Sequence, residues 1–294
     1  MVNLSNARDC PVCGARPVGL TFPYTTLFNG ARFHYLKCCK CKSVFVDPVP
    51  DAQTFEKIYS KSSYHDQYYD GNVSAHYSDS VSLLNKHLKL STTVLDYGCG
   101  VGSFLKACSL QGFVPVGVEF DSEAAEFASQ NANCEVMSVK VFSGLSPTPR
   151  FDAIHMGDVL GHLPNPSATL THLLGFLKPG GLLFIEGPLE VNANPVFWTA
   201  RIIGTVKRLL KPTFTPNFPP TMLFRTDAQS QKAFFTRLSK GLSMVHWEVY
   251  DTGWPYASGG LIKRRIAALA VFMSGRHFSG ATFGNRFKAI LVKR

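Results

Sequence analysis

Short apolar runs alternate along most of the chain with stretches in which apolar residues recur every three or four positions. The first pattern is typical of buried parallel strands, and the second is typical of helices that pack on them. The apolar runs predict strands at residues 92–95, 114–118, 134–139, 151–156, 182–186, 244–250 and 287–292. Helical spacing predicts helices at residues 53–59, 80–90, 103–110, 123–130 and 226–238. This alternation indicates an α/β fold built around a parallel sheet.

The turn after the first of these strands is rich in glycine, because Asp96 is followed by Gly98, Gly100 and Gly102. Glycine suits a turn that needs positive φ or that must let a ligand approach the main chain closely. Dinucleotide sites use similar turns, but a carboxylate at Asp96 would repel a pyrophosphate and could bind a cationic amine. Glu119 ends the next strand, where an acid can accept both hydroxyls of a ribose. A cationic amino acid joined to a ribose therefore fits better than a dinucleotide.

With these residues, segment 95–102 resembles the first motif of class I S-adenosylmethionine-dependent methyltransferases. The resemblance runs from about residue 92 to the C-terminus, and later motifs follow in the family's order. It implies a seven-stranded Rossmann-like sheet whose final strand is antiparallel. By position it also implies that Asp96, Gly98 and Gly100 line the methionine end of S-adenosylmethionine and that Glu119 holds the ribose. A strand-turn-helix unit for another nucleotide is the alternative.

The loop after the fourth predicted strand carries Asp158 and His162. Ligands of open α/β sheets bind beyond the carboxyl ends of the strands, so both residues belong near the chemistry. The loop resembles the family's post-strand motif, although Gly161 stands where a glutamate is common. We expect His162 to act as general base and Asp158 to contact the cofactor. Glu186, at the end of the fifth strand, is expected to orient the substrate or assist His162. The alternatives are a structural hydrogen-bonding role for His162 and, for Glu186, an exposed acid at a strand end.

Cysteines cluster near the N-terminus in two Cys-x-x-Cys pairs, formed by Cys10 with Cys13 and by Cys38 with Cys41. Four thiolates in such pairs typically hold a tetrahedral zinc ion, provided that a hairpin over residues 18–35 brings the pairs together. Cys39 is expected to be a spare, and disulfides are the rival interpretation. A structural role is favoured over nucleic-acid binding, because the basic residues of this segment are scattered. Some bacterial methyltransferases that modify sugars carry a similar zinc-binding segment.

The chain is predicted to contain a zinc ribbon over residues 1–46 and a linker with lid helices over residues 47–91. The methyltransferase domain follows over residues 92–294, with helical cap insertions at about residues 192–222 and 257–282. Tyrosines and histidines between residues 59 and 77 are expected to line the pocket or to pack on the ribbon. Both insertions read as basic amphipathic helices, which can lie on a membrane but more often cap an active site.

Composition adds two constraints. Apolar residues make up 45% of the 294 residues, which is enough for a real core, and no run is long enough to span a membrane. A cytoplasmic protein is the prediction, with peripheral contact to the inner membrane face as the alternative. The net charge of +10 favours an anionic partner surface without choosing between nucleic acid, phospholipid and a phosphorylated substrate.

The predicted activity is methyl transfer from S-adenosylmethionine to a hydroxyl of a sugar or of a glycan or lipid-linked precursor, with His162 taking the hydroxyl proton. A small molecule, sugar or glycan is thus the expected partner, and nucleic acid is less favoured. One alternative is an RNA-directed methyltransferase that uses the ribbon and the basic surface. Against this alternative, the chain lacks the Asp/Asn-Pro-Pro-Tyr/Phe motif that amino-directed members carry directly after the fourth strand. A non-catalytic binding module is the other alternative, and the intact Asp96, glycines and Glu119 argue against it.

Overall fold

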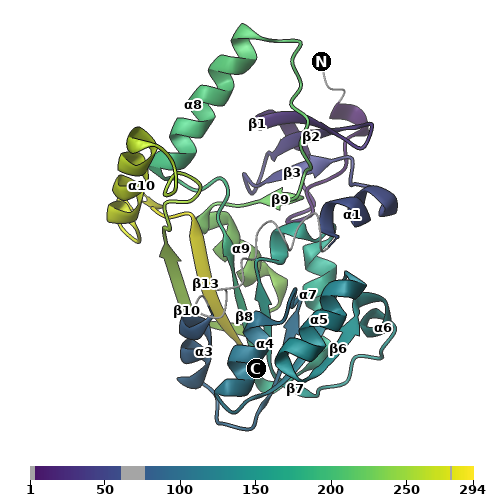
Figure 1. The fold of residues 1–294 in the computed structure, drawn as a ribbon. Coiled ribbons are helices and arrows are strands. Elements are labelled where there is room, and N and C mark those ends of the chain that lie inside the picture. The colour runs from purple at the N-terminus through teal and green to yellow at the C-terminus, as the bar shows by residue number, and fades with distance from the viewer. Residues whose placement is uncertain (1–3, 61–76, 279) are drawn as a thin grey trace.

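The computed structural model describes residues 4–60, 77–278 and 280–294, and Figure 1 shows two sheets with helices around them. The larger sheet has seven strands in the order β10-β13-β8-β7-β4-β5-β6. Their bounds are β4 Thr93–Tyr97, β5 Val114–Glu119, β6 Glu135–Ser138, β7 Phe151–Gly157, β8 Leu177–Pro188, β10 Leu242–Tyr250 and β13 Arg286–Lys293. Strand β13 runs antiparallel to both of its neighbours, while the pairs from β8 to β6 are parallel. The predicted seven-stranded sheet with an antiparallel final strand is confirmed.

The helices fall close to the positions that the periodicity predicts. Their bounds are α1 Ala52–Tyr59, α3 Ser78–Asn85, α4 Ser103–Leu110, α5 Ser122–Ala132, α6 Val139–Ser143, α7 Pro166–Phe176, α8 Pro195–Leu210, α9 Ala228–Leu238 and α10 Leu261–Met273. Side-chain caps set several starts, as the Asp121 carboxylate accepts the Ala124 amide and the Asp227 carboxylate accepts that of Ser230. Such caps satisfy amides that have no partner within the helix. Short 3-10 turns occupy Leu4–Asn6 (η1) and Leu160–His162 (η4).

Large aromatic side chains fill the core between the larger sheet and its helices. Phe104, Phe142, Phe176, Phe184 and Phe287 are fully buried. The central strands β7 and β8 are buried on both faces along most of their length, as expected for parallel strands that are covered on both sides. This packing positions the carboxyl ends of β4, β5 and β7 at one edge of the sheet.

The smaller sheet follows the order β1-β2-β3-β9, with β1 Pro17–Phe28, β2 Ala31–Cys38, β3 Val44–Asp47 and β9 Phe224–Arg225. The predicted hairpin turns at Asn29 and Gly30, which both have positive φ (50° and 77°), as a two-residue hairpin turn requires. Strand β9 lies much later in the sequence, after α8, and pairs with the edge of β3. A sheet edge has unpaired main-chain groups, so this pairing joins the N-terminal segment to the rest of the chain.

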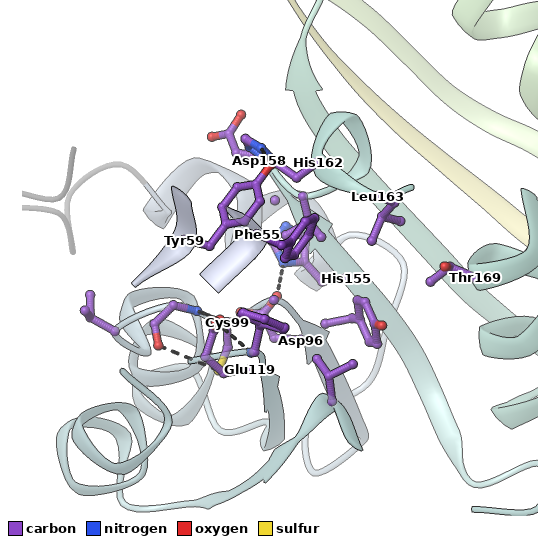
Figure 2. A pocket seen from close by; sticks show the side chains of 18 of the residues that line it. Phe55, Tyr59, Asp96, Cys99, Glu119, His155, Asp158, His162, Leu163 and Thr169 are labelled. Atoms are coloured by element: carbon purple, nitrogen blue, oxygen red, sulfur yellow. Dashed lines mark hydrogen bonds and ion pairs between the residues drawn. The ribbon is translucent and has the colours of Figure 1, made fainter. Parts of the chain in front are cut away.

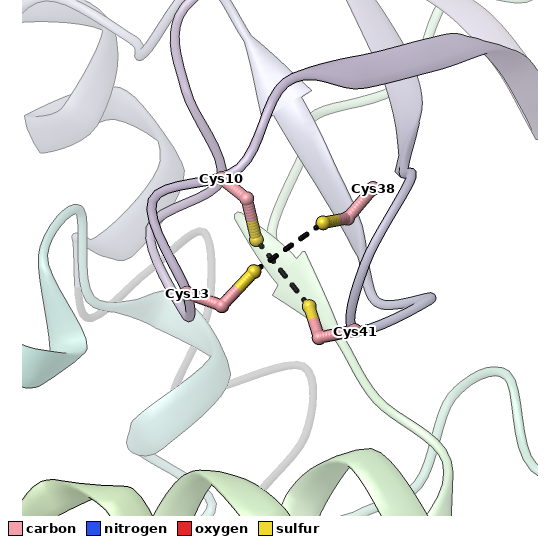
Figure 3. A group of neighbouring side chains, drawn as sticks. All are labelled: Cys10, Cys13, Cys38 and Cys41. Carbon is pink, nitrogen blue, oxygen red and sulfur yellow. Dashed lines mark hydrogen bonds between the residues drawn. The ribbon is translucent and has the colours of Figure 1, made fainter.

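The four paired cysteines, Cys10, Cys13, Cys38 and Cys41, point toward one another at the end of the hairpin (Figure 3). The Sγ atoms of Cys10 and Cys41 are 3.6 Å apart, those of Cys13 and Cys38 are 3.4 Å apart, and all four lie within 4.8 Å of one another. A tetrahedral zinc ion with Zn–S bonds of about 2.3 Å places its sulfurs about 3.8 Å apart. The four thiols therefore fit a structural zinc ion. All eight cysteines are free thiols and Cys39 is exposed, so the cluster needs no disulfide.

Two predicted helices end earlier than expected, and one predicted patch falls outside the described residues: the helix predicted at residues 80–90 is α3, which ends at Asn85. The second basic helix ends at Met273 instead of continuing to residue 278, because Gly275 adopts positive φ (71°) and the following residues turn. Strands β11 His277–Phe278 and β12 Ala281–Thr282 then form a small hairpin. Most of the tyrosine and histidine patch, including Tyr64, His65, Tyr68, Tyr69 and His76, lies outside the described residues.

A helix that crosses a bilayer must be both long and predominantly apolar. Within residues 4–60, 77–278 and 280–294, no helix combines the necessary length and apolar character.

We predict that the purified protein carries about one zinc ion per chain and that Cys13→Ser lowers this content to well below half, because a structural site needs all four thiolates. Metal analysis measures the content, and thermal unfolding should show a lower Tm for the variant. The exposed Cys39 provides the matched control, since Cys39→Ser should keep both zinc and Tm. Full zinc content in Cys13→Ser would contradict the site.

Candidate functional site

A cavity of about 570 Å³ opens beyond the carboxyl ends of β4, β5 and β7 (Figure 2). Its walls combine polar groups from these strand ends with aromatic side chains from helix α1 and the loops. The lining includes Phe55, Tyr59, Tyr77, Asp96, Gly98, Gly100, Glu119, Phe120, His155, Asp158, Val159 and His162. Ligands of open α/β sheets bind at this edge, so the cavity lies where the sequence predicts the site.

The glycine turn forms the floor of the cavity. Gly98, Gly100 and Gly102 have φ values of 80°, 53° and 80°, which side chains rarely tolerate. A Cβ at Gly98 would lie 2.3 Å from a methyl group of Val159, and one at Gly102 would lie 2.9 Å from the Cα of Ala128. The backbone conformation and the close packing therefore each require glycine at positions 98 and 102.

Asp96 lies at the edge of the cavity and forms an ion pair with His155 on the neighbouring strand. The two residues are register partners on β4 and β7, and His155 Nδ1 donates to Asp96 Oδ1 at 2.8 Å. On the other side of the ring, His155 Nε2 donates to Glu186 Oε1 on β8 at 3.2 Å. The imidazole stacks on Phe104 with ring centroids 3.7 Å apart. A single buried histidine thus joins two carboxylates across three adjacent strands.

This arrangement favours the charged form of His155. Burial lowers its pKa, but the charge of Asp96 and the hydrogen bonds to both carboxylates outweigh burial and raise the pKa of His155 to about 9. Burial alone would raise the pKa of Glu186, whereas His155, Lys288 and the Ser80 hydroxyl together hold it below its usual value. Lys288 Nζ lies 3.7 Å from Glu186 Oε2, and Ser80 Oγ donates to the same oxygen at 2.9 Å. The cluster therefore contains compensated charges.

Glu119 is buried at the end of β5, beside the glycine turn. Its Oε2 accepts the Gly100 amide at 2.8 Å, and its Oε1 accepts the amides of Phe120 and Asp121 at 2.7 and 3.1 Å. These main-chain bonds fix an acceptor-only carboxylate at the cavity wall, and they also hold the glycine turn in place.

His162 lies on η4 and reaches the cavity from the other side. Its Nδ1 donates to the Thr221 carbonyl at 2.6 Å, and the Tyr59 hydroxyl lies 3.1 Å from the same nitrogen. A carbonyl can only accept, so the proton lies on Nδ1 and the basic nitrogen is Nε2. Burial lowers the pKa of His162, against smaller opposing effects of the Thr221 carbonyl and nearby carboxylates. The ring is therefore neutral at neutral pH.

Asp158 follows β7 with positive φ (58°) and also lines the cavity. Its two carboxylate oxygens accept from Nη2 of Arg286 on β13 at 2.7 and 2.8 Å. Arg286 Nε in turn donates to the Tyr250 hydroxyl at 3.1 Å. Asp158 is therefore bound to a cation of the antiparallel strand, and the predicted contact with a cofactor stays a prediction.

A family model described as a methyltransferase domain matches residues 69–211. The sequence over this range thus matches that of a methyltransferase domain. The match includes the glycine turn, Glu119, His155 and His162, which all contribute to the cavity lining.

The methyltransferase domain is also similar to curated proteins. The chain is 29% identical over 118 residues to the ubiquinone biosynthesis O-methyltransferase of Dechloromonas aromatica (strain RCB), covering 38% of this chain and 49% of that protein. It is 27% identical over 131 residues to the ubiquinone biosynthesis O-methyltransferase of Coxiella burnetii (strain Dugway 5J108-111), covering 42% and 51%. The chain thus spans about half the length of these relatives.

Among solved structures, the fold resembles that of magnesium protoporphyrin IX methyltransferase (ChlM) from Synechocystis PCC 6803 with bound SAH. The TM-score is 0.54 at 16% identity, and the likeness covers 83% of this chain and 100% of that chain. At this identity the comparison shows the fold, and it agrees with the methyltransferase domain identified from the sequence match.

The predicted site residues do not all lie at the cavity. Asp96, Glu119, Asp158 and His162 line one cavity, whereas Glu186 is not part of the lining and binds His155. The carboxylate of Glu186 is bound to a different histidine, and its expected role in orienting the substrate or assisting His162 stays a prediction.

His155 is the site residue that sequence reasoning missed. It interrupts the apolar strand over residues 151–157, and an ionisable residue at a buried strand position needs a charged or hydrogen-bonding partner. That signal was available, although the partner was not. Phe55 and Arg286 were missed as well, because nothing in their local sequence marks them as neighbours of the cavity.

We predict that stability falls as the pH rises through the pKa of His155. Below pH 6.5 the native and unfolded states both bind this proton, and between about 6.5 and 9 only the native state holds it. The free energy of unfolding should therefore decrease by up to about 3 kcal/mol across this window. Urea unfolding at several pH values measures it.

His155→Gln should remove most of that decrease, because glutamine carries no proton that titrates. The exposed His87 supplies the control, and His87→Gln should keep the full pH dependence. Equal slopes in wild type and His155→Gln would show that the buried imidazole does not bind the proton.

Proposed function

We propose that this protein transfers a methyl group from S-adenosylmethionine to a hydroxyl oxygen of a small molecule. The observation that supports it most is the shared cavity, where Asp96, the glycine turn and Glu119 lie opposite a neutral, oriented His162. The methyltransferase domain over residues 69–211 and relatives that are named O-methyltransferases agree with it.

The residues present fit the cofactor. Its ammonium group suits the carboxylate of Asp96, and its ribose hydroxyls suit the oxygens of Glu119. Gly98 and Gly100 both line the cavity beside these two residues. Phe120 follows Glu119 and lines the same wall, where an aromatic ring can stack on the adenine. The solved neighbour with bound SAH has the same fold.

In the mechanism, S-adenosylmethionine supplies an electrophilic methyl group on a sulfonium. With the cofactor bound, His162 Nε2 would accept the proton of the acceptor hydroxyl, which would make its oxygen nucleophilic toward that methyl group. The Thr221 carbonyl holds the imidazole in the tautomer that this step needs. Phe55 and Tyr59 of α1 line the cavity next to His162, which helps to exclude water and hold the acceptor in line.

The acceptor is expected to have an apolar body next to its hydroxyl. Beyond the cofactor residues, much of the lining is aromatic or aliphatic, including Phe55, Tyr59, Val139 and Leu163. A sugar or glycan hydroxyl stays a prediction from the sequence, and neither the relatives' names nor this wall adds support for it. The relatives are instead named for O-methyl transfer in ubiquinone biosynthesis, which favours a hydroxyl of a compound from that class.

The cofactor proposal can be tested at Glu119. Glu119→Ala removes the acceptors for two hydroxyls, so S-adenosylmethionine and its demethylated product should bind about tenfold to a hundredfold more weakly. Calorimetry measures both affinities. Glu123→Ala changes an exposed acid four residues later and should leave them unchanged. Unaltered affinity in Glu119→Ala would reject this placement of the ribose.

The base can be tested with His162→Asn, because the asparagine amide can still donate to the Thr221 carbonyl while the basic nitrogen is lost. We expect turnover to fall by about a hundredfold or more, with cofactor affinity nearly unchanged. His87→Asn serves as the surface control. Since burial lowers the pKa of His162, wild-type activity should persist down to about pH 6.5. Undiminished turnover in His162→Asn would assign the base elsewhere.

A further inference from the structure

Helices α8 and α10 carry an apolar surface that the cavity does not use. They pack against each other, and Figure 1 shows α10 beside the start of α8, which extends away from the larger sheet. The surface, here called the α8–α10 face, is formed by exposed side chains of both helices: Ile202, Val206, Leu209, Leu210, Ile262 and Phe272. Leu209, Leu210 and Ile262 are each about three-quarters exposed, at 75%, 76% and 76%.

The other side of α8 explains why this face points outward. A Cβ at Gly204 would lie 2.4 Å from the Phe22 ring, and Tyr24 on β1 forms a hydrogen bond of 2.8 Å with Thr205. The guanidinium of Arg208 lies 4.1 Å from the centroid of the Tyr24 ring. Residues 202, 206 and 209 are three or four positions apart and lie on the opposite side of the helix. The contacts with β1 therefore fix α8 with its apolar side in solvent.

The charge around the face has one sign. Residues 191–226 and 252–294 contain no aspartate or glutamate, whereas they contain 13 lysines and arginines out of the 30 in the chain. Arg201, Lys207, Lys211, Arg264 and Arg265 are exposed, and no ion pair neutralises them within the described residues. Aliphatic side chains thus lie among unpaired cations at one end of the molecule.

We propose that the α8–α10 face docks on an anionic lipid bilayer. The leucines and isoleucines enter the boundary between head groups and acyl chains, and the surrounding lysines and arginines bind the phosphates. A nucleic acid would use the cations but gain little from exposed leucine and isoleucine side chains. A second copy would bring two acid-free basic faces together, which like-charge repulsion opposes. This proposal does not depend on the proposed activity, because binding needs neither cofactor nor acceptor.

The test uses the full zinc-loaded protein and sedimentation with vesicles of phosphatidylcholine, either alone or with about one third phosphatidylglycerol. We expect binding to the anionic vesicles at least about tenfold tighter than to the neutral ones, and weakening in high salt. The double variant Leu209→Ser/Leu210→Ser should lose about tenfold in affinity, as should Lys207→Glu/Lys211→Glu. Leu110→Ser changes an equally exposed leucine on α4 and is the control. Circular dichroism confirms that the variants fold.

Three results would overturn the proposal. The first is the absence of binding to anionic vesicles, or binding that the double variants do not weaken. The second is a dimer in light scattering that Leu209→Ser/Leu210→Ser dissociates, which would assign the face to a second copy. The third is binding of single-stranded RNA that the same variants abolish while vesicle binding persists. A fluorescence blue shift on vesicles that is lost in Trp198→Phe would place α8 in the lipid boundary and support the proposal.

Discussion

The site depends on the buried ion pair between His155 and its two carboxylates. Asp96 and Glu186 are both buried, and an unpaired buried carboxylate is costly to ionise. The imidazolium compensates both charges, and it does so from the middle of the sheet, on the strand between theirs. Lys288 on β13 extends the cluster to the antiparallel strand, and Ser80 extends it to α3. The carboxylate at the cavity edge is thus held by contacts that reach across the domain.

The N-terminal segment takes part in the site as well as in the fold. Tyr59 at the end of α1 donates to the Thr221 carbonyl, which also accepts from His162. Helix α1 follows the small sheet directly, and the cysteine cluster and β9 anchor that sheet to the core. A metal ion at the cysteines would therefore stabilise one wall of the cavity from outside it. The small sheet adds its own buried cluster of Phe33, Tyr35, Val44, Val46 and Leu223 to this support.

Acidic and basic residues are distributed differently along the sequence. Acidic residues concentrate in the first two thirds of the sequence, where Asp96, Glu119 and Asp158 line the cavity and Glu186 lies behind it on His155. The segments that form α8, α10 and β13 contain lysines and arginines but no aspartate or glutamate. Arg286 and Lys288 turn inward from β13 to meet acids of the site, whereas the cations of α8 and α10 point into solvent. The same basic segments thus supply both counter-charges and an outer surface.

Several features were determined by the sequence alone, because they depend on neighbours in the chain. Helix α4 begins and ends at the predicted residues 103 and 110, the hairpin turns at Asn29 and Gly30, and Asp121 caps α5. The cysteine spacing predicted the four-thiol cluster, and the glycine turn with Glu119 predicted the cavity's position. Turn chemistry, capping and strand-end placement are local rules that a sequence carries in full.

Only the tertiary structure decided which side chains meet. Asp96 binds His155, 59 positions away, because β4 and β7 pair in that register, and Asp158 binds Arg286, 128 positions away, because β13 inserts antiparallel beside β8. Glu186 faces His155 from the adjacent strand. Strand β9 completing the N-terminal sheet is a fourth case. Partners of this kind depend on strand register and on packing between distant segments, which no local pattern of residues specifies.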